Sequence, residues 1–330
     1  MKIRELAEKY NDYIIERRRF YHTIPELSHE EHETTENLVK DLEGMGIEVT
    51  TFRDYTGAIG LIKGEKPGKT VALRADIDAL PVKEDTGLAF SSKYPGKMHA
   101  CGHDAHMSML LGAAKILVEL KGELEGDIKL IFQGAEETGH GAEYYVKNGY
   151  VDDVDAIFGM HIWGTLDAPL ISVDAGARMA SMDNFKIIVK GSATHGSSPH
   201  LGKDAIVAAS SIVMNMQTFV SRMNDPLNPL VVTIGTINGG ERFNIIADHV
   251  ELVGTVRTHS RELRESIEVE LRSIAENTAR ALGCEAELEY FYLPGPIINE
   301  HENLNRIARD AALKLYGEEG LTEMPKLMGS

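Results

Sequence analysis

Cysteine, tryptophan and long apolar runs are scarce in this sequence. Its two cysteines, Cys101 and Cys284, cannot form a disulfide framework, which excludes the class of small disulfide-stapled secreted domains. No apolar run approaches the roughly 18 to 20 residues that span a bilayer. The first ten residues alternate charged and apolar side chains and contain no apolar signal core. We therefore expect a cytoplasmic protein without a membrane partner.

Positive charge is also scarce. The chain has 34 lysines and arginines against 51 acidic residues, a formal net charge of −17. Nucleic acids and anionic membranes are bound through basic faces, so this balance argues against both as partners. With 330 residues, of which 43% are hydrophobic, the chain is too long for one ordinary core and is expected to form two domains.

Strand and helix patterns alternate over the first half of the chain. A helical pattern covers residues 4–44 with a break at residues 24–26, and the clearest helix covers residues 104–119. The predicted strands are residues 70–73, 127–132 and 154–160. This alternation predicts an α/β fold with a mostly parallel sheet flanked by helices, in which ligands bind at the carboxyl ends of the strands.

The pattern changes near residue 173. The elements that follow have the order β-α-β-β-α-β of a ferredoxin-like unit, with strands at residues 185–190, 230–237, 249–258 and 285–291 and helices at residues 203–220 and 261–282. We predict that residues 174–291 form a domain inserted into a larger one. The larger domain would then be discontinuous, comprising residues 1–173 plus 292–330 and a helix over residues 302–316.

The stretch His-Ala-Cys-Gly-His-Asp-Ala-His at residues 99–106 contains the strongest chemical signal. Cys101 and His103 flank Gly102, where a tight backbone turn can aim both side chains at one point. Thiolate and neutral imidazole are ligands that zinc prefers, and manganese, cobalt and nickel are also suited. A packed core thiol beside a stray loop histidine is the structural alternative.

Three further side chains of this stretch have weaker interpretations. We expect His99 and His106 to lie behind the ligands or to face solvent, and Asp104 to serve as the N-cap of the helix.

Metal-ligating residue types also follow the predicted strands. Asp76 and Asp78 follow the first strand, Glu136 and Glu137 the second, and His161 the third. Metal-dependent hydrolysis needs one carboxylate as a ligand and another as a proton shuttle to the attacking water, and adjacent glutamates can divide these roles. A solvated acidic turn and a half-buried histidine are the alternatives.

Together these segments resemble the cocatalytic metallo-amidohydrolases and metallopeptidases, a family that includes aminoacylases, hippurate hydrolases and auxin–amino acid conjugate hydrolases. The resemblance extends in order over residues 74–81, 98–103, 132–137, 159–163 and 194–195. Distant peptidases of the family carry His-x-Asp where this chain has Asp76-Ile-Asp78, so the chain resembles the amidohydrolase branch. The resemblance implies a zinc-peptidase-like catalytic domain, an inserted lid that forms a homodimer, and two divalent metal ions.

The resemblance also implies a role for each matching residue of the catalytic domain. Cys101 would bridge the two ions, His103 and His161 would complete one of them, and Glu137 would bind the other. Glu136 would be the general base and acid.

Further roles follow from the resemblance outside the ligand set. Asp78 would orient a ligand from behind. His195 would stabilise the oxyanion, reaching across a dimer interface, although a mobile surface loop is its structural alternative. Asn244 and Arg257 would grip a substrate carboxylate, which the bidentate guanidinium of arginine suits.

The implied activity is hydrolysis of the amide bond of N-acyl-L-amino acids, which releases a carboxylic acid and the amino acid. The alternatives are N-acetyl-diaminopimelate deacetylation, dipeptide cleavage, or an inactive relic that dimerises or binds a ligand. The sequence ends in Leu-Met-Gly-Ser at residues 327–330, whereas in relatives a similar Met-Gly-Ser precedes Glu-Asp-Phe and a stretch with the last metal-binding histidine. We therefore expect a fragment or a truncated form whose second metal site is incomplete.

Overall fold

The computed structural model describes residues 2–329 and divides the chain into two compact units, Met1–Pro169 and Leu170–Ser330. Each unit has its own sheet and its own buried core. The predicted return of residues 292–330 to the first domain stays a prediction.

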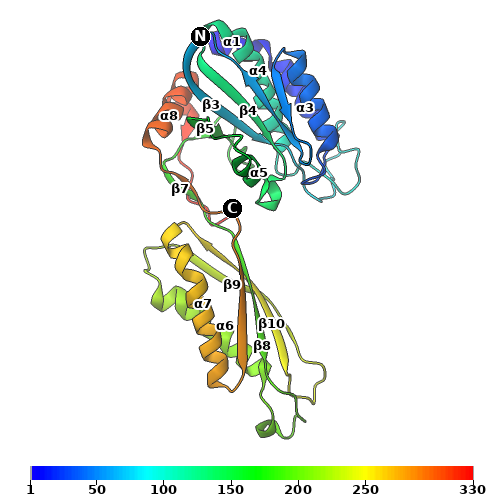
Figure 1. Cartoon of the computed structure of the whole chain (residues 1–330), viewed down its shortest axis with the longest axis vertical. Coiled ribbons are helices and arrows are strands. Elements are labelled where there is room, and N and C mark those ends of the chain that lie inside the picture. Colours follow the sequence, from blue (N-terminus) through cyan, green and yellow to red (C-terminus); the bar gives the residue numbers. More distant parts are fainter. Residues whose placement is uncertain (1, 330) are drawn as a thin grey trace. The chain divides into compact units, whose positions relative to one another are not determined.

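A five-stranded sheet in the order β1-β2-β4-β3-β5 forms the centre of the first unit (Figure 1). Its strands are β1 (Glu48–Thr51), β2 (Gly57–Ile62), β3 (Lys66–Asp76), β4 (Glu125–Gln133) and β5 (Ala156–Gly159). β3 pairs in parallel with β4 and β5, whereas β2 pairs antiparallel with β1 and β4. The strand pairings are thus evenly mixed, and the expectation of a parallel sheet is confirmed only for β4, β3 and β5.

The two strands that sequence reasoning missed explain this difference. β2 contains Gly57 and Gly60, and glycine is depleted in strands because it costs backbone entropy and offers no side chain to pack. At Gly57 the backbone leaves no room for a side chain, since a Cβ would lie 2.4 Å from the carbonyl oxygen of Phe132 on β4.

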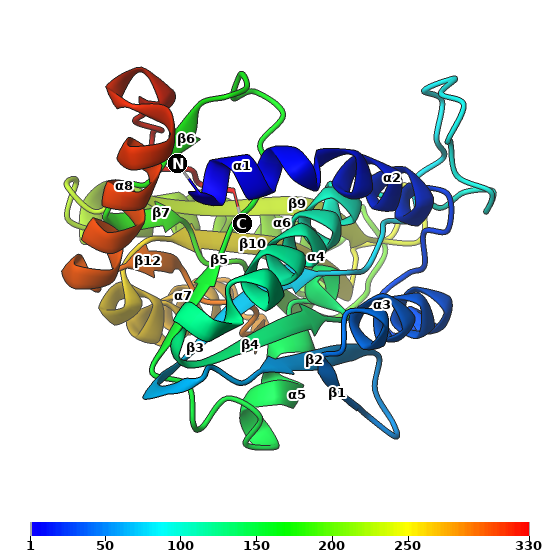
Figure 2. The same ribbon diagram turned by 90° about the horizontal axis from the view of Figure 1, so that it is seen from above.

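Helices cover both faces of this sheet. Figure 2 shows α3 and α4 on one side of β2 and β4 and α5 on the other. Leu38 of α3 and Leu111 of α4 are fully buried in one apolar cluster with Phe132 of β4. The helical elements are α1 (Lys2–Lys9), α2 (Asn11–His22), α3 (His32–Gly44), α4 (His103–Glu119) and α5 (Gly141–Lys147), with 3₁₀ turns at Lys121–Glu123 and Glu136–Thr138.

α4 begins one residue earlier than expected. Gly102, with φ of +88°, is its N-cap, so Asp104 lies within the first turn and the expectation that Asp104 caps the helix is wrong. The buried Asp104 carboxylate instead accepts from His22 Nδ1 at 2.7 Å and pairs with Arg18 Nε at 2.9 Å, both on α2. A long-range contact with α2 has replaced the local cap.

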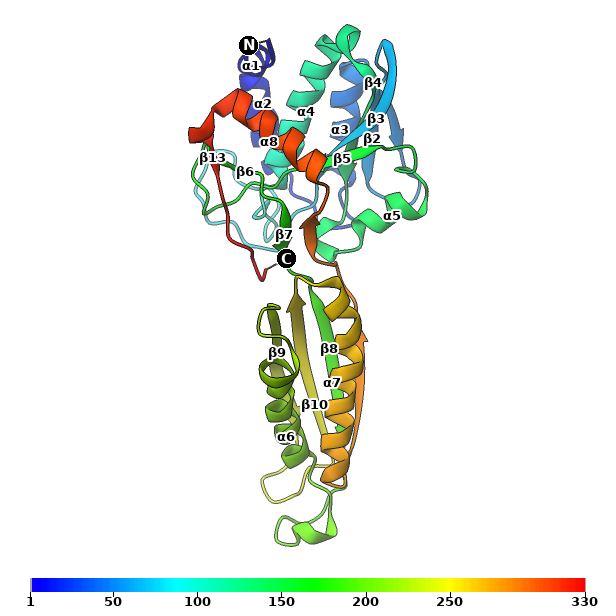
Figure 3. The ribbon, with the colours of Figure 1, turned by 90° about the vertical axis from the view of Figure 1, so that its left-hand side faces the viewer.

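The second unit contains a four-stranded antiparallel sheet in the order β11-β8-β10-β9. Its elements follow one another as β8 (Asp183–Lys190), α6 (Ala205–Thr218), β9 (Leu230–Gly239), β10 (His249–Thr258), α7 (Arg261–Ala281) and β11 (Glu285–Phe291). Figure 3 shows α6 and α7 on the same face of this sheet, where apolar residues such as Phe185, Ile212 and Leu271 form the core. The assignment of this region to an inserted lid domain stays a prediction.

The rest of the second unit consists of short strands and one longer helix. β12 pairs antiparallel with β7, and β13 pairs in parallel with β6. The elements are β6 (Ile171–Ser172), β7 (Gly176–Met179), β12 (Ile297–Asn299), α8 (Glu302–Tyr316) and β13 (Leu321–Thr322), with 3₁₀ turns at Pro199–Leu201 and Glu318–Gly320 and a π-helical turn at Phe219–Met223.

Within residues 2–329, no helix combines the length and the apolar character that crossing a membrane requires. The cytoplasmic location stays a prediction.

Candidate metal centre

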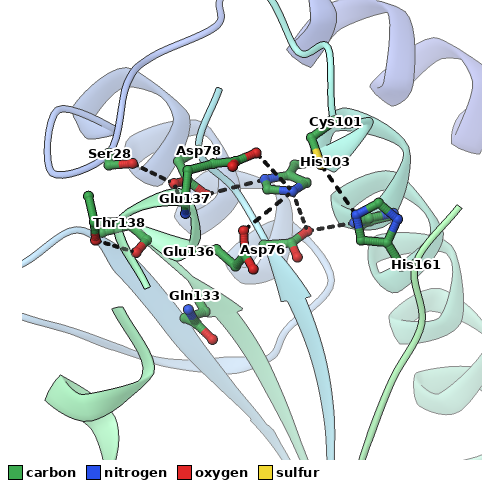
Figure 4. Close-up of polar contacts among 12 residues, drawn as sticks. Ser28, Asp76, Asp78, Cys101, His103, Gln133, Glu136, Glu137, Thr138 and His161 are labelled. Atoms are coloured by element: carbon green, nitrogen blue, oxygen red, sulfur yellow. Dashed lines mark hydrogen bonds and ion pairs between the residues drawn. The ribbon is translucent and has the colours of Figure 1, made fainter. Parts of the chain in front are cut away.

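The candidate site lies at the carboxyl ends of β3, β4 and β5, where three strand ends and the start of α4 meet (Figure 4). Asp76 is the last residue of β3, and His161 follows β5 by two residues. Glu136 and Glu137 lie in the 3₁₀ turn after β4, and His103 is the first residue of α4. The polar side chains that the sequence placed at strand ends therefore converge, as expected for this type of sheet.

Gly102 brings two of these segments into close contact. Its φ of +88° lies in the left-handed region, which glycine adopts without steric cost. A Cβ at this position would lie 2.4 Å from Cδ1 of Ile162, next to His161. The loop that carries Cys101 can therefore pack directly against the segment that carries His161.

Cys101 and His161 face each other, with Sγ 3.3 Å from Nε2. The other ring nitrogen of His161, Nδ1, bonds to the carbonyl oxygen of Ile162. Because a carbonyl oxygen only accepts, Nδ1 carries the proton and Nε2 presents its lone pair toward the thiol. Burial lowers the pKa of His161, which favours this neutral form. A neutral imidazole with a free Nε2 is the form that binds metals.

His103 presents its outer nitrogen without a partner. Its Nδ1 lies 3.2 Å from Oδ1 of Asp78, while its buried Nε2 has no hydrogen-bond partner among residues 2–329. This Nε2 lies 3.8 Å from Oε1 of Glu137, a buried atom that likewise lacks a partner in the described part of the chain. Two unsatisfied buried atoms that face each other across a short gap are the arrangement expected when a cation fits between them.

The charge around His103 supports the same conclusion. Burial lowers the pKa of this imidazole, but the bond to Asp78, the nearby Cys101 and the charge of Asp76 outweigh burial and raise the pKa to about 11. The surroundings that favour a proton on the ring also favour a metal cation beside it.

Asp78 links this histidine to the turn after β4. Its Oδ2 accepts from the Ser28 hydroxyl at 2.7 Å and from the Glu137 backbone N–H at 3.0 Å. Burial opposes the charge of Asp78, but the bonds from His103, Glu137 and Ser28 outweigh burial and hold the pKa of Asp78 below its usual value. Asp78 is thus an ionised carboxylate that connects two potential ligands.

Glu136 lies at the open side of the cluster. Its side chain is 41% exposed, and Oε2 is 4.0 Å from His103 Nε2. Partial burial of the carboxyl group, together with the charges of Asp76 and Glu137, raises the pKa of Glu136 above its usual value. A solvent-accessible carboxyl with a raised pKa suits a group that both takes and returns a proton.

The ligand-type atoms form three groups, each with its atoms within 4.8 Å of one another. Cys101, His103 and His161 form the first group, His103, Glu136 and Glu137 the second, and Asp76, His103 and His106 the third. Cys101, His103, Glu136, Glu137 and His161 are thus brought together, with Asp78 directly behind His103.

The other predicted site residues belong to the second unit. His195 Nδ1 lies 2.8 Å from the hydroxyl of Ser197, and the Gly196 N–H donates to the carbonyl of Asn244 at 2.8 Å, so the loops that carry His195 and Asn244 are joined. Arg257 lies on β10. Their contact with a substrate stays a prediction.

Sequence reasoning left the environment of His106 open and missed that of Glu31, and both residues are buried near the site. His106 is only 3% exposed and bonds to Asp76, which excludes the solvent-facing alternative. The sequence feature that could have predicted this position is the spacing of His106 from His103, because residues three apart lie on one face of a helix. Glu31 is fully buried and accepts the Ala135 N–H at 2.6 Å, just before Glu136. No local pattern in the sequence indicates this contact, which joins positions 104 residues apart.

Comparisons with known proteins agree with this geometry. The sequence model of peptidase family M20/M25/M40 matches residues 72–330. An N-acetyl-L-cysteine deacetylase of Bacillus subtilis is 41% identical over 297 residues, which cover 90% of this chain and 71% of that protein. An N-acyl-L-amino acid amidohydrolase of Geobacillus stearothermophilus is 38% identical over 302 residues, which cover 91% of this chain and 82% of that protein.

A similar solved structure comes from Bacillus subtilis and is described as a dinuclear metal-binding peptidase of the M20 family. It matches with a TM-score of 0.84 and 36% identity, covering 97% of this chain and 83% of that chain. The chain therefore belongs to peptidase family M20/M25/M40.

Proposed function

We propose that this protein is a metal-dependent amidohydrolase that cleaves the amide bond of N-acyl-L-amino acids. The observation that carries the proposal is the pair of unsatisfied buried atoms, His103 Nε2 and Glu137 Oε1, beside the Cys101–His161 pair and within reach of Glu136. The relatives named as an N-acyl-L-amino acid amidohydrolase and an N-acetyl-L-cysteine deacetylase support the substrate class.

The donor set would offer three protein ligands to one divalent ion and two to a second ion, whose site would be incomplete. Cys101 would be the shared ligand, His161 Nε2 would bind one ion, and Glu137 would bind the other. We assign His103 to the ion of Glu137, because its free Nε2 points at the free Glu137 oxygen at 3.8 Å. This differs from the pairing of His103 with His161 that the sequence resemblance implied. The separations of 3.3 Å in the Cys101–His161 pair and 3.8 Å in the His103–Glu137 pair are both short enough for one ion to contact both members of a pair.

Glu136 is the proton carrier of the proposed reaction. When bound, divalent ions supply Lewis-acid activation of water and of the amide carbonyl. The Glu136 carboxylate takes a proton from the attacking water, and its raised pKa lets it hold that proton and return it to the leaving amine nitrogen. Asp78 holds His103 in one orientation throughout, through the bond between Oδ1 and Nδ1.

The second unit supplies substrate contacts in this proposal. His195 stabilises the oxyanion, while Asn244 and Arg257 bind the substrate carboxylate. We further propose that residues 174–291 act as a lid through which two copies of the chain form a homodimer. The order β-α-β-β-α-β and the antiparallel sheet of this region support its assignment as a ferredoxin-like module.

Metal loading and a substrate panel test the proposal. The chain is loaded with zinc, manganese, cobalt or nickel, its metal content is measured, and it is assayed on N-acetyl amino acids, hippurate, N-acetyl-diaminopimelate and dipeptides. We expect hydrolysis of N-acyl amino acids that stops when a chelator removes the metal. A metal-loaded chain that cleaves only dipeptides or only N-acetyl-diaminopimelate contradicts the substrate class, and a chain that binds no metal supports the inactive relic.

Cys101→Ser tests the shared ligand. A serine hydroxyl ionises far less readily than a thiol, so the variant is expected to lose metal binding and not merely turnover. Cys284→Ser is the matched control, because Cys284 lies buried in the core of the second unit and should leave the metal content unchanged. Full metal content in Cys101→Ser would mean that Cys101 is only a packed thiol.

A further inference from the structure

Both ring nitrogens of His106 are engaged in hydrogen bonds. Nδ1 lies 2.6 Å from Oδ1 of Asp76, and Nε2 accepts the backbone N–H of Ile162 at 2.9 Å. A backbone N–H can only donate, so Nε2 must hold a lone pair and Nδ1 must carry the proton. His106 is therefore a neutral imidazole in a single tautomer, donating to Asp76 and accepting from Ile162.

This engagement argues against His106 as a metal ligand, although it groups with Asp76 and His103. The lone pair on Nε2 is directed at the Ile162 N–H, and Nδ1 has none to offer. The ring nevertheless lies close to a proposed ligand, with its centroid 4.6 Å from that of His161. Its place is thus behind the metal centre and not in it.

The His106 bonds complete a line of contacts across the strand ends. Arg74 Nε donates to Oε1 of Gln133, the last residue of β4, at 3.0 Å. Arg74 Nη1 donates to Asp76 Oδ2 at 2.8 Å, and Asp76 Oδ1 then accepts from His106. The line connects the end of β4, the end of β3, the first turns of α4 and the backbone after β5. Since Asp76 and His106 are 1% and 3% exposed, water does not compete for these bonds.

We propose that His106 is a positioning residue for His161. By accepting the Ile162 N–H, His106 fixes the backbone beside His161 so that His161 Nε2 faces Cys101 Sγ at 3.3 Å. This inference rests on the proposed metal centre, because it assigns His106 the task of holding one ligand at the distance where it shares an ion with Cys101. Partners of this kind contribute about 10- to 100-fold to metal affinity.

Two substitutions separate the two bonds of the ring. In His106→Gln the longer side chain places an amide oxygen near the former Nε2, which keeps an acceptor for Ile162. In His106→Asn the shorter side chain places its amide nitrogen near the former Nδ1, which keeps a donor for Asp76 and leaves the Ile162 N–H without an acceptor. The two variants are therefore matched controls for each other.

The full chain and both variants are titrated with cobalt(II), and the thiolate-to-cobalt absorption of Cys101 is recorded. We expect His106→Asn to weaken the cobalt binding that produces this absorption by about 10- to 100-fold. His106→Gln is expected to retain most of the affinity. Equal affinity in His106→Asn and the unaltered chain overturns the inference, and so does an equal loss in both variants, because the Ile162 bond is then not the cause.

Nitrogen NMR of the metal-free chain gives a second readout that does not depend on the variants folding. His106 should show a protonated Nδ1 and an unprotonated Nε2, and the reverse tautomer or an imidazolium overturns the inference. An unaltered chain that produces no thiolate–cobalt absorption contradicts the proposed metal centre itself, and the inference falls with it. A normal absorption that His106→Asn leaves unchanged contradicts only the inference about His106 and leaves the proposed metal centre intact.

Discussion

Each unit holds a carboxylate among polar groups, but the two carboxylates differ in whether their buried oxygen atoms have hydrogen-bond partners. Asp183 of β8 is fully buried, and both of its oxygens are occupied. Arg264 donates to them at 2.8 and 2.6 Å, and the Tyr290 hydroxyl and the Leu293 N–H donate at 3.1 Å each. In the first unit, by contrast, Glu137 Oε1 and His103 Nε2 are buried with no hydrogen-bond partner in residues 2–329.

This difference separates a structural cluster from a binding site. An unpartnered buried polar atom costs about 1–3 kcal/mol, so folding alone disfavours the arrangement in the first unit. The Asp183 cluster satisfies every group from within the chain and holds β8, α7 and the end of β11 together. The His103–Glu137 pair is complete only when an ion supplies the missing partner. The free-energy cost of leaving both atoms unpartnered in the metal-free chain therefore indicates that the pair binds an ion.

Substitution of Glu136, which lies beside the unpartnered His103–Glu137 pair, should have the largest effect of all, and this effect should be on catalysis. Glu136→Gln should retain its metal ions and its thermal stability, because Glu136 is not among the proposed ligands. Turnover should fall by about 10²- to 10⁴-fold, since the amide cannot take up or return a proton. Metal analysis, thermal unfolding and kcat on an N-acyl amino acid measure the three properties. Turnover within tenfold of the unaltered chain would remove Glu136 from the mechanism.

Disruption of the Asp183 cluster in the second unit should lower the stability of the fold. Arg264→Met leaves the Asp183 carboxylate buried without its cation, and the free energy of unfolding should fall by about 3–5 kcal/mol. Urea unfolding measures the change. Lys190→Met is the control, because its ion pair with Glu287 is exposed and should contribute no more than about 1 kcal/mol. Similar losses in both variants would contradict the distinction drawn between buried and exposed pairs.

Glu137→Gln is expected to affect stability differently with and without metal. In the metal-free chain the substitution removes a partly exposed carboxylate that attracts the protonated His103 at 3.8 Å but repels Glu136, so the free energy of unfolding should change by no more than about 1 kcal/mol. Metal at 100 times its dissociation constant should stabilise the unaltered chain by about 2.7 kcal/mol, and the variant should lack this gain. Thermal unfolding with and without metal provides the measurement. A variant that is destabilised without metal would show that Glu137 supports the fold.

The smallest expected effect concerns pH. Burial raises the pKa of Glu31 above its ordinary value despite the bonds from Thr56 and Ala135. The folded chain then holds this proton to a higher pH than the unfolded chain. The contribution of Glu31 to stability is therefore fully present below the unfolded pKa and is lost as the pH rises through the folded pKa.

Glu31→Gln should remove this pH dependence. Unfolding free energies of both chains from pH 4 to pH 7 test the expectation, and the difference should move in favour of the glutamine variant as the pH rises. A difference that stays constant over this range would mean that Glu31 titrates alike in the folded and unfolded chains.

The sequence predicted those features that depend on local pattern. Parallel strands bring their carboxyl ends to one edge of a sheet, so positions far apart in the chain become neighbours through topology alone. This is why the sequence could identify the candidate site residues Cys101, His103, Glu136, Glu137 and His161. The helix over residues 302–316 and the strand over residues 285–291 were predicted with the bounds that the structure has. Their apolar periodicity is sufficient for this.

Contacts that depend on packing were not predictable. Asp104 has the chemistry of an N-cap, but the left-handed Gly102 starts α4 one residue earlier, and α2 then offers His22 and Arg18 as partners. The tautomer of His106 depends on Ile162, which lies 56 residues away. Such pairs follow from the approach of whole elements, which no short window of sequence records.

Gly102 has a consequence for the spacing of the proposed ligands. The gap between the Cys101 loop and the Ile162 side chain is so narrow that only a hydrogen atom fits on the glycine α-carbon. A larger residue at this position would have to displace the Ile162 side chain, and Ile162 directly follows His161. We therefore expect a substitution at Gly102 to change the distance between the Cys101 loop and His161 while leaving every proposed ligand in place.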